Sequence, residues 1–290
     1  MINWSNSDKL SSWKKLMSLK GMVSVADELS GSNAVNRINE YCIPMGGNLK
    51  FNYAAKQVNA QILKTLSELA EEQQLVEKYE ALLNGEVINT GEKRMVLHQL
   101  TRGQLGNDVM ADGVNKREFY INEVKRIADF ANDVHSGKLL NEKGEKYTTV
   151  CQIGIGGSDL GPRAMYLALE NWAKKNDPFK MEARLIPNVD PDEAAGVVEG
   201  LENTKTIFIL VSKSGTTLET LTNESFVKDF IKKAGCDASK HMIAVTSETS
   251  PLAHNPDYMA AFYMDDYIGG RYSSTSGVGG AVLSLAFGPK

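Results

Sequence analysis

Hydrophobic residues recur at helical spacing through the first part of the chain. One apolar stripe between residues 58 and 69 fits a single face of a helix, and a second lies between residues 75 and 83. Residues 10–17 show the same spacing. The polar, glycine-containing segment 103–115 favours a boundary at its end. The pattern therefore predicts a mainly helical N-terminal region over residues 1–115.

From residue 116 onward, helical and strand-like patterns alternate. A helical stripe runs from Tyr120 to Val134 and closes at Gly137. The predicted strands that follow are 148–155, 183–188, 205–211 and 241–246, and the predicted helices between them are 159–175, 191–201 and 216–234. Such alternation implies right-handed crossovers. We therefore expect an α/β domain over residues 116–290, with a parallel, doubly wound sheet flanked by helices.

Composition narrows the possible functions. The 290 residues carry a net charge of −4, which argues against nucleic acid as the main partner because such proteins present a basic face. No apolar run is long enough to cross a membrane, and the N-terminus lacks the pattern of a signal peptide. Three cysteines without a CxxC pair predict a reducing, cytoplasmic location. No histidine has a partner at metal-ligand spacing, so no metal site is expected.

A glycine-rich turn follows the first predicted strand. Gly156, Gly157 and Ser158 lie between this strand and a helix that begins near Asp159. Glycine lets the backbone approach a ligand, and the start of a helix favours an anion. The segment is neither a dinucleotide fingerprint nor a P-loop, because the required third glycine and the lysine are missing. It predicts either a phosphate site or a tight turn that binds nothing.

A second such junction is richer in hydrogen-bonding groups. Residues 212–217 read Ser-Lys-Ser-Gly-Thr-Thr and stand between a buried strand and a helix. Hydroxyls and backbone N–H groups at a helix start can surround phosphate oxygens, and Lys213 adds a positive charge. The alternative is that the hydroxyls only cap the helix, although one would suffice for that.

The third junction contains an arginine. Gly269 and Gly270 precede Arg271, whose guanidinium keeps its charge and offers a rigid fork of donors. The alternative is a solvated arginine in a surface loop. The third junction follows a short apolar run at residues 260–264. All three junctions thus follow strands, so they lie at the carboxyl edge of the predicted sheet, where ligands bind in such folds.

Together the three segments resemble the glucose-6-phosphate isomerase family. They read GIGGSDLGP from residue 154, SKSGTTLET from residue 212 and YIGGRYSSTSGVGG from residue 267, and LHQLTRG from residue 97 resembles another family segment. The Ser-Gly pair at 214–215 resembles bacterial members and the wider sugar-isomerase (SIS) domain group rather than animal members. The resemblance covers nearly all of this chain but not the family's whole length.

The resemblance implies an aldose–ketose isomerase of glycolysis and gluconeogenesis that interconverts glucose 6-phosphate and fructose 6-phosphate without a cofactor. It implies the following positions: Gly157 and Ser158 lining the sugar-phosphate pocket, Ser212, Lys213, Ser214 and Thr217 around the phosphate, Gly270 against the substrate, and Arg271 beside the enediolate. Glu219 matches a family glutamate near the ring-opening groups. The alternative is that Glu219 is only a solvated carboxylate on the surface of a helix.

Family members continue beyond the segments matched here, and their proton-transferring glutamate and ring-opening histidine and lysine come later in the chain. We therefore expect this chain to be the N-terminal portion of a homodimeric isomerase, and to be inactive by itself. The alternative is a non-catalytic SIS module that senses a sugar phosphate. The Gly-Gly-Arg segment and the helical N-terminal region favour the isomerase, because a sensor module needs neither.

Overall fold

The computed structural model describes residues 2–103, 105–176 and 179–289. The chain forms two compact units, Met1–Ala81 and Leu82–Lys290, each described separately below. The boundary expected between residues 115 and 116 lies inside the second of these units and stays a prediction.

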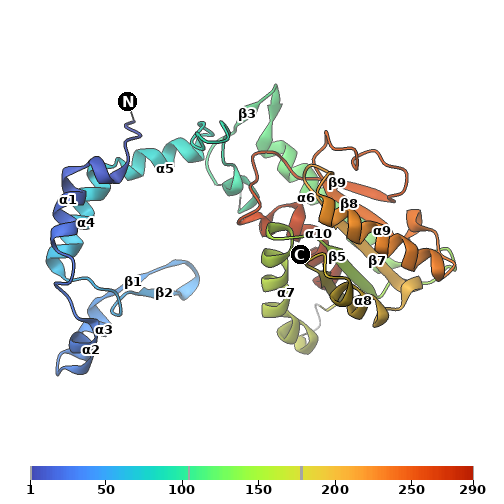
Figure 1. The fold of residues 1–290 in the computed structure, drawn as a ribbon, viewed down its shortest axis with the longest axis horizontal. Helices are drawn as coiled ribbons and strands as arrows, with labels where there is room; N and C mark the ends of the chain where they lie inside the picture. The colour runs from blue at the N-terminus through green and yellow to red at the C-terminus, as the bar shows by residue number, and fades with distance from the viewer. Residues whose placement is uncertain (1, 104, 177–178, 290) are drawn as a thin grey trace. The chain divides into compact units, whose positions relative to one another are not determined.

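The first unit is mostly helical (Figure 1). Its elements are η1 (Ser7–Lys9), α1 (Ser11–Ser18), α2 (Val25–Ser30), α3 (Ala34–Glu40), β1 (Cys42–Pro44), η2 (Gly46–Asn48), β2 (Lys50–Asn52), α4 (Ala60–Glu72) and the start of α5 (Leu75–Leu83). The helices predicted from the three apolar stripes are confirmed as α1, α4 and α5. Leu19, Val23 and Ile62 form the small core beside α1 and α4. The β1–β2 hairpin was not predicted, because strands of only three residues, of which all but Cys42 are exposed, leave no apolar pattern.

The second unit contains the sheet and the helices around it. Its elements are η3 (His98–Thr101), β3 (Met110–Ala111), β4 (Val114–Asn115), α6 (Lys116–Ser136), β5 (Thr149–Ile153), α7 (Gly157–Asn176), β6 (Glu182–Ile186), α8 (Pro191–Glu199), η4 (Asn203–Lys205), β7 (Thr206–Val211), α9 (Leu218–Lys233), η5 (Ala238–Lys240), β8 (Met242–Thr246), β9 (Ala260–Tyr263), η6 (Ser273–Thr275) and α10 (Gly277–Phe287). The expected alternation of strands and helices is confirmed. In the described residues no helix is long and apolar enough to cross a membrane.

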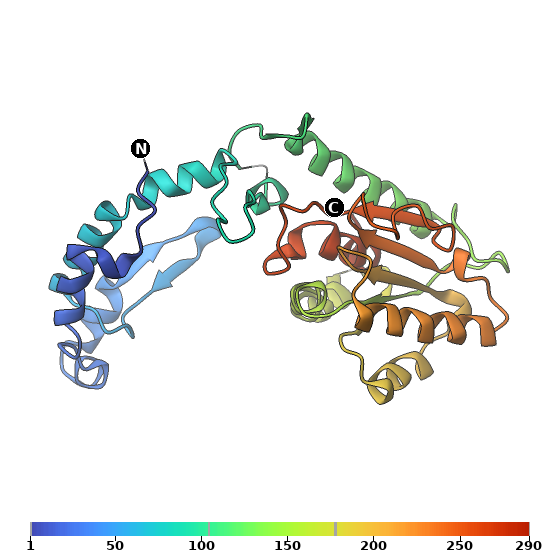
Figure 2. The same ribbon diagram turned by 45° about the horizontal axis from the view of Figure 1, so that its top comes forward.

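The five-stranded sheet has the order β6-β5-β7-β8-β9, and every neighbouring pair is parallel. Figure 2 shows α6 on one side of the sheet and α8 and α9 on the other. Ile207 and Ile209 of β7 face the core that includes α6 and α10. Phe208 and Leu210 face the core that includes α8 and α9. The doubly wound architecture is therefore as predicted, and because both faces are covered the strands read as continuous apolar runs.

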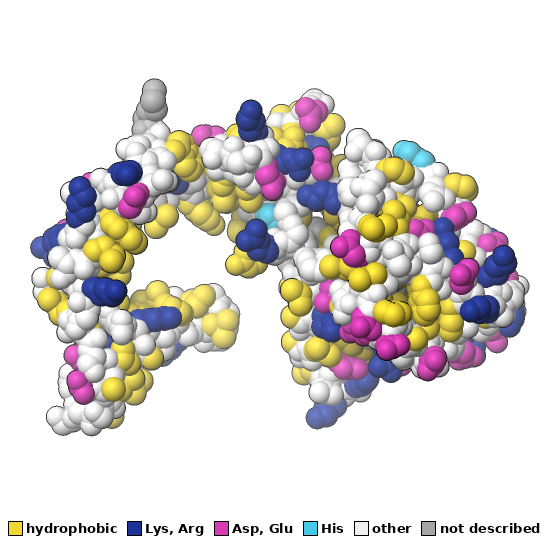
Figure 3. All heavy atoms as spheres, viewed as in Figure 1, with side chains coloured by type: hydrophobic (Ala, Val, Ile, Leu, Met, Phe, Trp, Pro, Cys, Tyr) yellow, Lys and Arg dark blue, Asp and Glu magenta, His cyan; other side chains and the backbone are white. Residues whose placement is uncertain are grey.

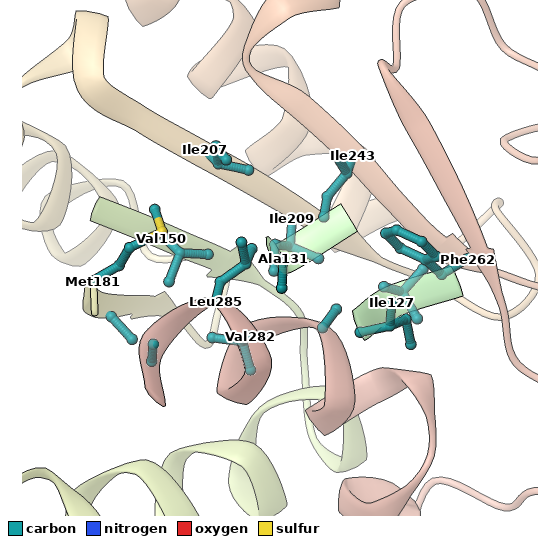
Figure 4. Packing of buried hydrophobic residues seen from close by; sticks show 14 of the residues in the cluster. Ile127, Ala131, Val150, Met181, Ile207, Ile209, Ile243, Phe262, Val282 and Leu285 are labelled. Carbon is teal, nitrogen blue, oxygen red and sulfur yellow. The ribbon is translucent and has the colours of Figure 1, made fainter. Parts of the chain in front are cut away.

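The helix α10 closes the first of these cores. Val282 and Leu285 point from α10 toward the sheet residues Val150 and Ile209, as Figure 4 shows. Ile127 and Ala131 of α6 belong to the same cluster. This packing fixes the start of α10 under the carboxyl edge of the sheet, so the loop between β9 and α10 is held at the edge where ligands are expected.

Candidate functional site

A cavity of about 490 Å³ lies at the carboxyl edge of the sheet. Residues that follow four of the strands line it: Ser158 at the start of α7 after β5, Ser212, Lys213, Ser214 and Thr217 after β7, Ser247, Thr249 and Ser250 after β8, and Asp266 after β9. Arg94, from the segment before η3, adds a positive charge to the wall. Because parallel strands end at one edge, segments far apart in sequence supply a single polar cavity.

The loop after β7 is held in shape by its own hydroxyls. The Ser212 Oγ accepts a hydrogen bond from the Gly215 N–H at 3.1 Å and donates one to the Thr217 Oγ1 at 3.3 Å. Gly215 has a φ of +67°, and a Cβ added there would lie 2.2 Å from the Ser250 Oγ. Glycine is required at this position by both conformation and space. The backbone of this loop is therefore held in one conformation.

The helix that follows this loop begins without a side-chain cap. Thr217 is the N-cap residue of α9, yet its hydroxyl makes no capping hydrogen bond. The hydroxyl at the N-cap position therefore does not cap this helix. The first N–H groups of a helix have no partners within the helix. Thr217 and Thr220, at the start of this helix, line the cavity, and the start of a helix favours an anion.

Lys213 connects this loop to the segment after β9. Its Nζ donates to the carbonyl oxygen of Ile268 at 2.7 Å and reaches that of Asp266 at 3.4 Å. Burial lowers the pKa of Lys213 from its ordinary value, and the Asp266 carboxylate partly offsets that effect. The ammonium group thus lies at the cavity wall in a partly desolvated position, where its interaction with an anion is stronger than in water.

The glycine-rich turn after β5 packs directly on the third motif. A Cβ added to Gly157 would lie 2.4 Å from the carbonyl oxygen of Gly270. The Ser273 Oγ donates to the Gly157 carbonyl at 3.2 Å. The buried Gln152 donates from its Nε2 to the Ser158 carbonyl at 2.7 Å. Gly157 is therefore needed for the contact between the two backbones, whereas a Cβ added to Gly270 would make only an ordinary contact, 3.7 Å from the Gly157 Cα.

The segment at Leu97–Gly103 holds the third motif in place. The His98 Nε2 lies 3.1 Å from the carbonyl oxygen of Gly269, and Arg102 donates from its Nη2 to the Tyr272 carbonyl at 2.7 Å. Burial lowers the pKa of His98, and the nearby Arg102 charge acts in the same direction. Neutral His98 then donates to Gly269 from Nε2. Tyr272 has a φ of +64°, a conformation uncommon for a residue with a side chain.

Arg271 is exposed beside this strained residue. Within residues 2–103, 105–176 and 179–289 its guanidinium makes no hydrogen bond or ion pair. A side chain without protein partners is available to a ligand, although Arg271 does not line the cavity described above. Glu219 is also exposed, in the first turn of α9, and is likewise outside the cavity wall.

The structure thus gathers most of the predicted site residues. Ser158, Ser212, Lys213, Ser214 and Thr217 line the cavity, Gly157 and Gly270 pack together beside it, and the roles of Arg271 and Glu219 stay predictions. Sequence reasoning missed Arg94, Thr220, Ser247, Thr249, Ser250 and Asp266. The run Ser-Glu-Thr-Ser at 247–250 follows the buried strand β8, which is the same signal that identified the other loops.

The adjacent carboxylates at 265 and 266 do not form an acid–base pair. Asp265 is buried and its Oδ2 lies 3.0 Å from the Lys116 Nζ. Asp266 is exposed and lines the cavity, where its Oδ1 lies 3.9 Å from the Arg94 Nη1. On the face that Figure 3 shows, acidic and basic side chains are mixed over the second unit. This mixture of charges on that face does not form the broad basic surface that nucleic acid requires.

Known proteins match the chain along nearly its whole length. Residues 52–289 match the family described as phosphoglucose isomerase. The chain is 60% identical over 291 residues to the glucose-6-phosphate isomerase of Treponema denticola, covering 99% of this chain and 55% of that protein. It is 51% identical to the glucose-6-phosphate isomerase of Treponema pallidum, covering 100% of this chain and 55% of that protein.

A solved structure agrees with these sequence matches. The crystal structure of a glucose-6-phosphate isomerase from Chlamydia trachomatis superposes with a TM-score of 0.85 at 31% identity, over 98% of this chain and 53% of that chain. The chain therefore spans about half the length of the relatives it matches.

Proposed function

The chain belongs to the phosphoglucose isomerase family, and from this premise we propose that the protein interconverts glucose 6-phosphate and fructose 6-phosphate. The observation that carries the proposal is the convergence of the three motifs at one sheet edge, around a cavity lined by hydroxyls and Lys213. A phosphate ester needs donors and positive charge. This cavity wall supplies both.

In this proposal the loop after β7 binds the phosphate. Ser214 and Thr217 donate to its oxygens together with the first N–H groups of α9, Ser212 holds the Thr217 hydroxyl in position, and Lys213 adds its charge. The phosphate is remote from carbons 1 and 2, so its binding energy orients the end of the sugar that reacts. Ser158 and the Gly157 backbone line the sugar's path at the neighbouring strand end.

The reaction moves a proton between carbons 1 and 2 and forms an enediolate on the way. Arg271 is the group assigned to that developing negative charge, because its guanidinium is exposed and without partners among the described residues. The clamp from His98 and Arg102 fixes the backbone that presents it. Glu219 stays a proposed contributor to ring opening. The residues described here are assigned to binding and charge stabilisation rather than to the proton transfer itself.

Two further parts of the proposal concern the whole protein. A homodimer in the cytoplasm is consistent with the family and with cysteines that form no disulfide in the structure.

The second candidate function is a non-catalytic SIS-type sensor of a sugar phosphate, which would also use the loop after β7. The clamped Gly-Gly-Arg segment favours the isomerase, since a sensor does not need a cation beside carbons 1 and 2.

Calorimetry on the 290-residue chain tests the phosphate assignment. Fructose 6-phosphate should bind, whereas fructose without its phosphate should not. Thr217→Val should weaken binding of fructose 6-phosphate by about 1.5–3 kcal/mol, the value of one charge-assisted hydrogen bond. The matched control is Thr222→Val in the same helix, because the Thr222 hydroxyl bonds only to the Leu218 carbonyl. Equal affinities for the wild type and Thr217→Val would refute the assignment.

A further inference from the structure

At the end of the sheet where the strands begin, three side chains of kinds that bind metal ions lie together. Glu142 comes from the turn between α6 and β5, and Cys236 and His241 come from the segment between α9 and β8. The carboxylate oxygen, the Sγ and the imidazole nitrogen all lie within 4.8 Å of one another. Because His241 immediately precedes β8 and contacts the first residue of β7, the cluster lies at the amino ends of the strands, away from the sugar-phosphate cavity.

The orientation of His241 is fixed by the protein. Its ring is completely buried, and its Nδ1 lies 2.9 Å from the carbonyl oxygen of Thr206. A carbonyl oxygen can only accept, so Nδ1 carries a hydrogen and Nε2 points toward Glu142. A histidine that binds a metal commonly donates its other ring N–H to a backbone carbonyl in this way. The tautomer needed for metal binding through Nε2 is therefore already selected.

The remaining groups are also held in place. The His241 Nε2 lies 2.8 Å from the Glu142 Oε2. The other oxygen of Glu142 accepts a hydrogen bond from the Asp237 backbone N–H at 3.1 Å. The Cys236 Sγ has a long contact of 3.8 Å to the Ala234 carbonyl oxygen. Backbone bonds thus orient two of the three side chains from outside the cluster, as second-shell partners do in metal sites.

Glu142 faces His241 from the solvent side of the cluster, because Glu142 is exposed whereas the His241 ring is fully buried. With Nδ1 held by the Thr206 carbonyl oxygen, the Nε2 of His241 is directed at the Glu142 carboxylate. A divalent ion would engage the carboxylate, the imidazole and the thiolate together, and would leave no donor atom of the cluster unused.

We propose that Glu142, Cys236 and His241 form a zinc-binding site at the amino ends of the strands. Nitrogen, sulfur and oxygen donors are the set that Zn²⁺ takes, whereas Mg²⁺ and Ca²⁺ select oxygen alone. Tetrahedral Zn²⁺ bonds of about 2.0–2.3 Å place the donors about 3.3–3.6 Å apart. Binding therefore requires the Nε2 and Oε2 atoms to separate slightly and the Cys236 Sγ to approach them. Water or a further donor completes the fourth position.

The ion's role would be structural. It would tie the turn that contains Glu142 to the segment 236–241, which is itself bonded to β7 through the Phe208 N–H and the His241 carbonyl at 2.7 Å. Zinc should therefore raise the melting temperature of the chain without altering its affinity for fructose 6-phosphate. Sequence analysis did not reveal this cluster, because Glu142 lies far from Cys236 and His241 along the chain.

Metal titration of the purified 290-residue chain tests the proposal. We expect one Zn²⁺ per chain in competition with a chromophoric chelator, and a Co²⁺ complex that shows thiolate-to-metal charge-transfer absorption. Cys236→Ser and Glu142→Gln should each lower Zn²⁺ affinity about tenfold or more, and Cys236→Ser should abolish the Co²⁺–thiolate absorption. These two variants are chosen because neither side chain is fully buried, unlike that of His241.

Two matched controls separate the site from adventitious binding. Cys42→Ser removes a half-buried cysteine in the other unit, and Glu145→Gln removes a carboxylate from the same turn as Glu142. Both should bind Zn²⁺ as the wild type does. The proposal is overturned if no Zn²⁺ binds at micromolar concentration, or if Cys236→Ser and Glu142→Gln bind it as tightly as the controls. Neither result would bear on the sugar-phosphate assignment.

Discussion

The ammonium nitrogen of Lys213 donates a hydrogen bond to the carbonyl oxygen of Ile268, 2.7 Å away. This bond joins the loop after β7 to the segment that presents Arg271. One side chain therefore serves two parts of the site, because it adds charge at the cavity wall and fixes the backbone next to the third motif.

The pH dependence of phosphate binding should report on Lys213. Burial lowers its pKa below the ordinary 10.5, so the ammonium loses its charge at a lower pH than an exposed lysine does. Affinity for fructose 6-phosphate should therefore fall on the alkaline side before pH 10.5 is reached. Calorimetry across this range checks the expectation. Lys213→Arg keeps the charge and should remove the alkaline fall, whereas a fall that persists in this variant would point to another group.

Gly157→Ala should disrupt the contact between the first and third motifs. The new methyl group would lie 2.4 Å from the Gly270 carbonyl oxygen, which is backbone and cannot rotate away. Overpacking of this kind costs about 1–3 kcal/mol of stability, and we expect weaker binding of fructose 6-phosphate as well. Gly196→Ala in α8 is the control, since nothing lies within 4 Å of the added methyl group. Equal denaturant midpoints for the two variants would contradict the packing argument.

Local patterns predicted the sheet well because its strands are buried on both faces. The run predicted as 205–211 is the strand Thr206–Val211, and its apolar continuity is what two covered faces require. The place of Ser212, Lys213, Ser214 and Thr217 at a cavity was also predictable, because these residues carry their polar groups in nearly consecutive positions after a buried strand. The short β1–β2 hairpin was not, since its exposed residues show no periodicity.

Long-range contacts were the part that sequence did not reveal. His98 contacts Gly269 and Arg94 contacts Asp266 across most of the second unit's length. Each contact joins residues about 170 positions apart, and no pattern of neighbouring residues marks such a contact in advance. Glu219, by contrast, was singled out through family resemblance, and the structure leaves it exposed outside the cavity wall. Its proposed role in ring opening therefore rests on resemblance alone.

In the first unit, Glu72 should stabilise the start of α1 in a pH-dependent way. Its carboxylate accepts hydrogen bonds from the backbone N–H groups of Ser11 at 3.2 Å and Ser12 at 2.9 Å. These bonds and those from the two hydroxyls, chiefly that of Ser12, lower the pKa of Glu72 to about 2. A lowered carboxyl pKa gives stability that is present above its ordinary 4.5 and is lost as the pH falls toward 2.

Hydrogen exchange of the α1 amides measures this effect. Glu72→Gln should exchange faster than the wild type at neutral pH, and the difference should shrink as the pH approaches 2. Glu71→Gln, one position earlier in α4, changes a carboxylate that makes no hydrogen bond or ion pair with the described residues, and should leave protection unchanged. If the difference in exchange rate between Glu72→Gln and the wild type stays constant with pH, the effect comes from altered packing rather than from the lost negative charge.

Arg271→Ala should separate catalysis from binding and from stability. Its guanidinium has no partner among the described residues, so the free energy of unfolding should change by no more than about 0.5 kcal/mol, as is usual for such surface positions. In catalytically active protein, kcat should fall more than KM rises, because negative charge develops chiefly in the transition state. Steady-state kinetics with fructose 6-phosphate gives both constants. A normal kcat with a raised KM would make Arg271 a substrate-binding residue, and a large loss of stability would show that the side chain has a structural partner in the native protein.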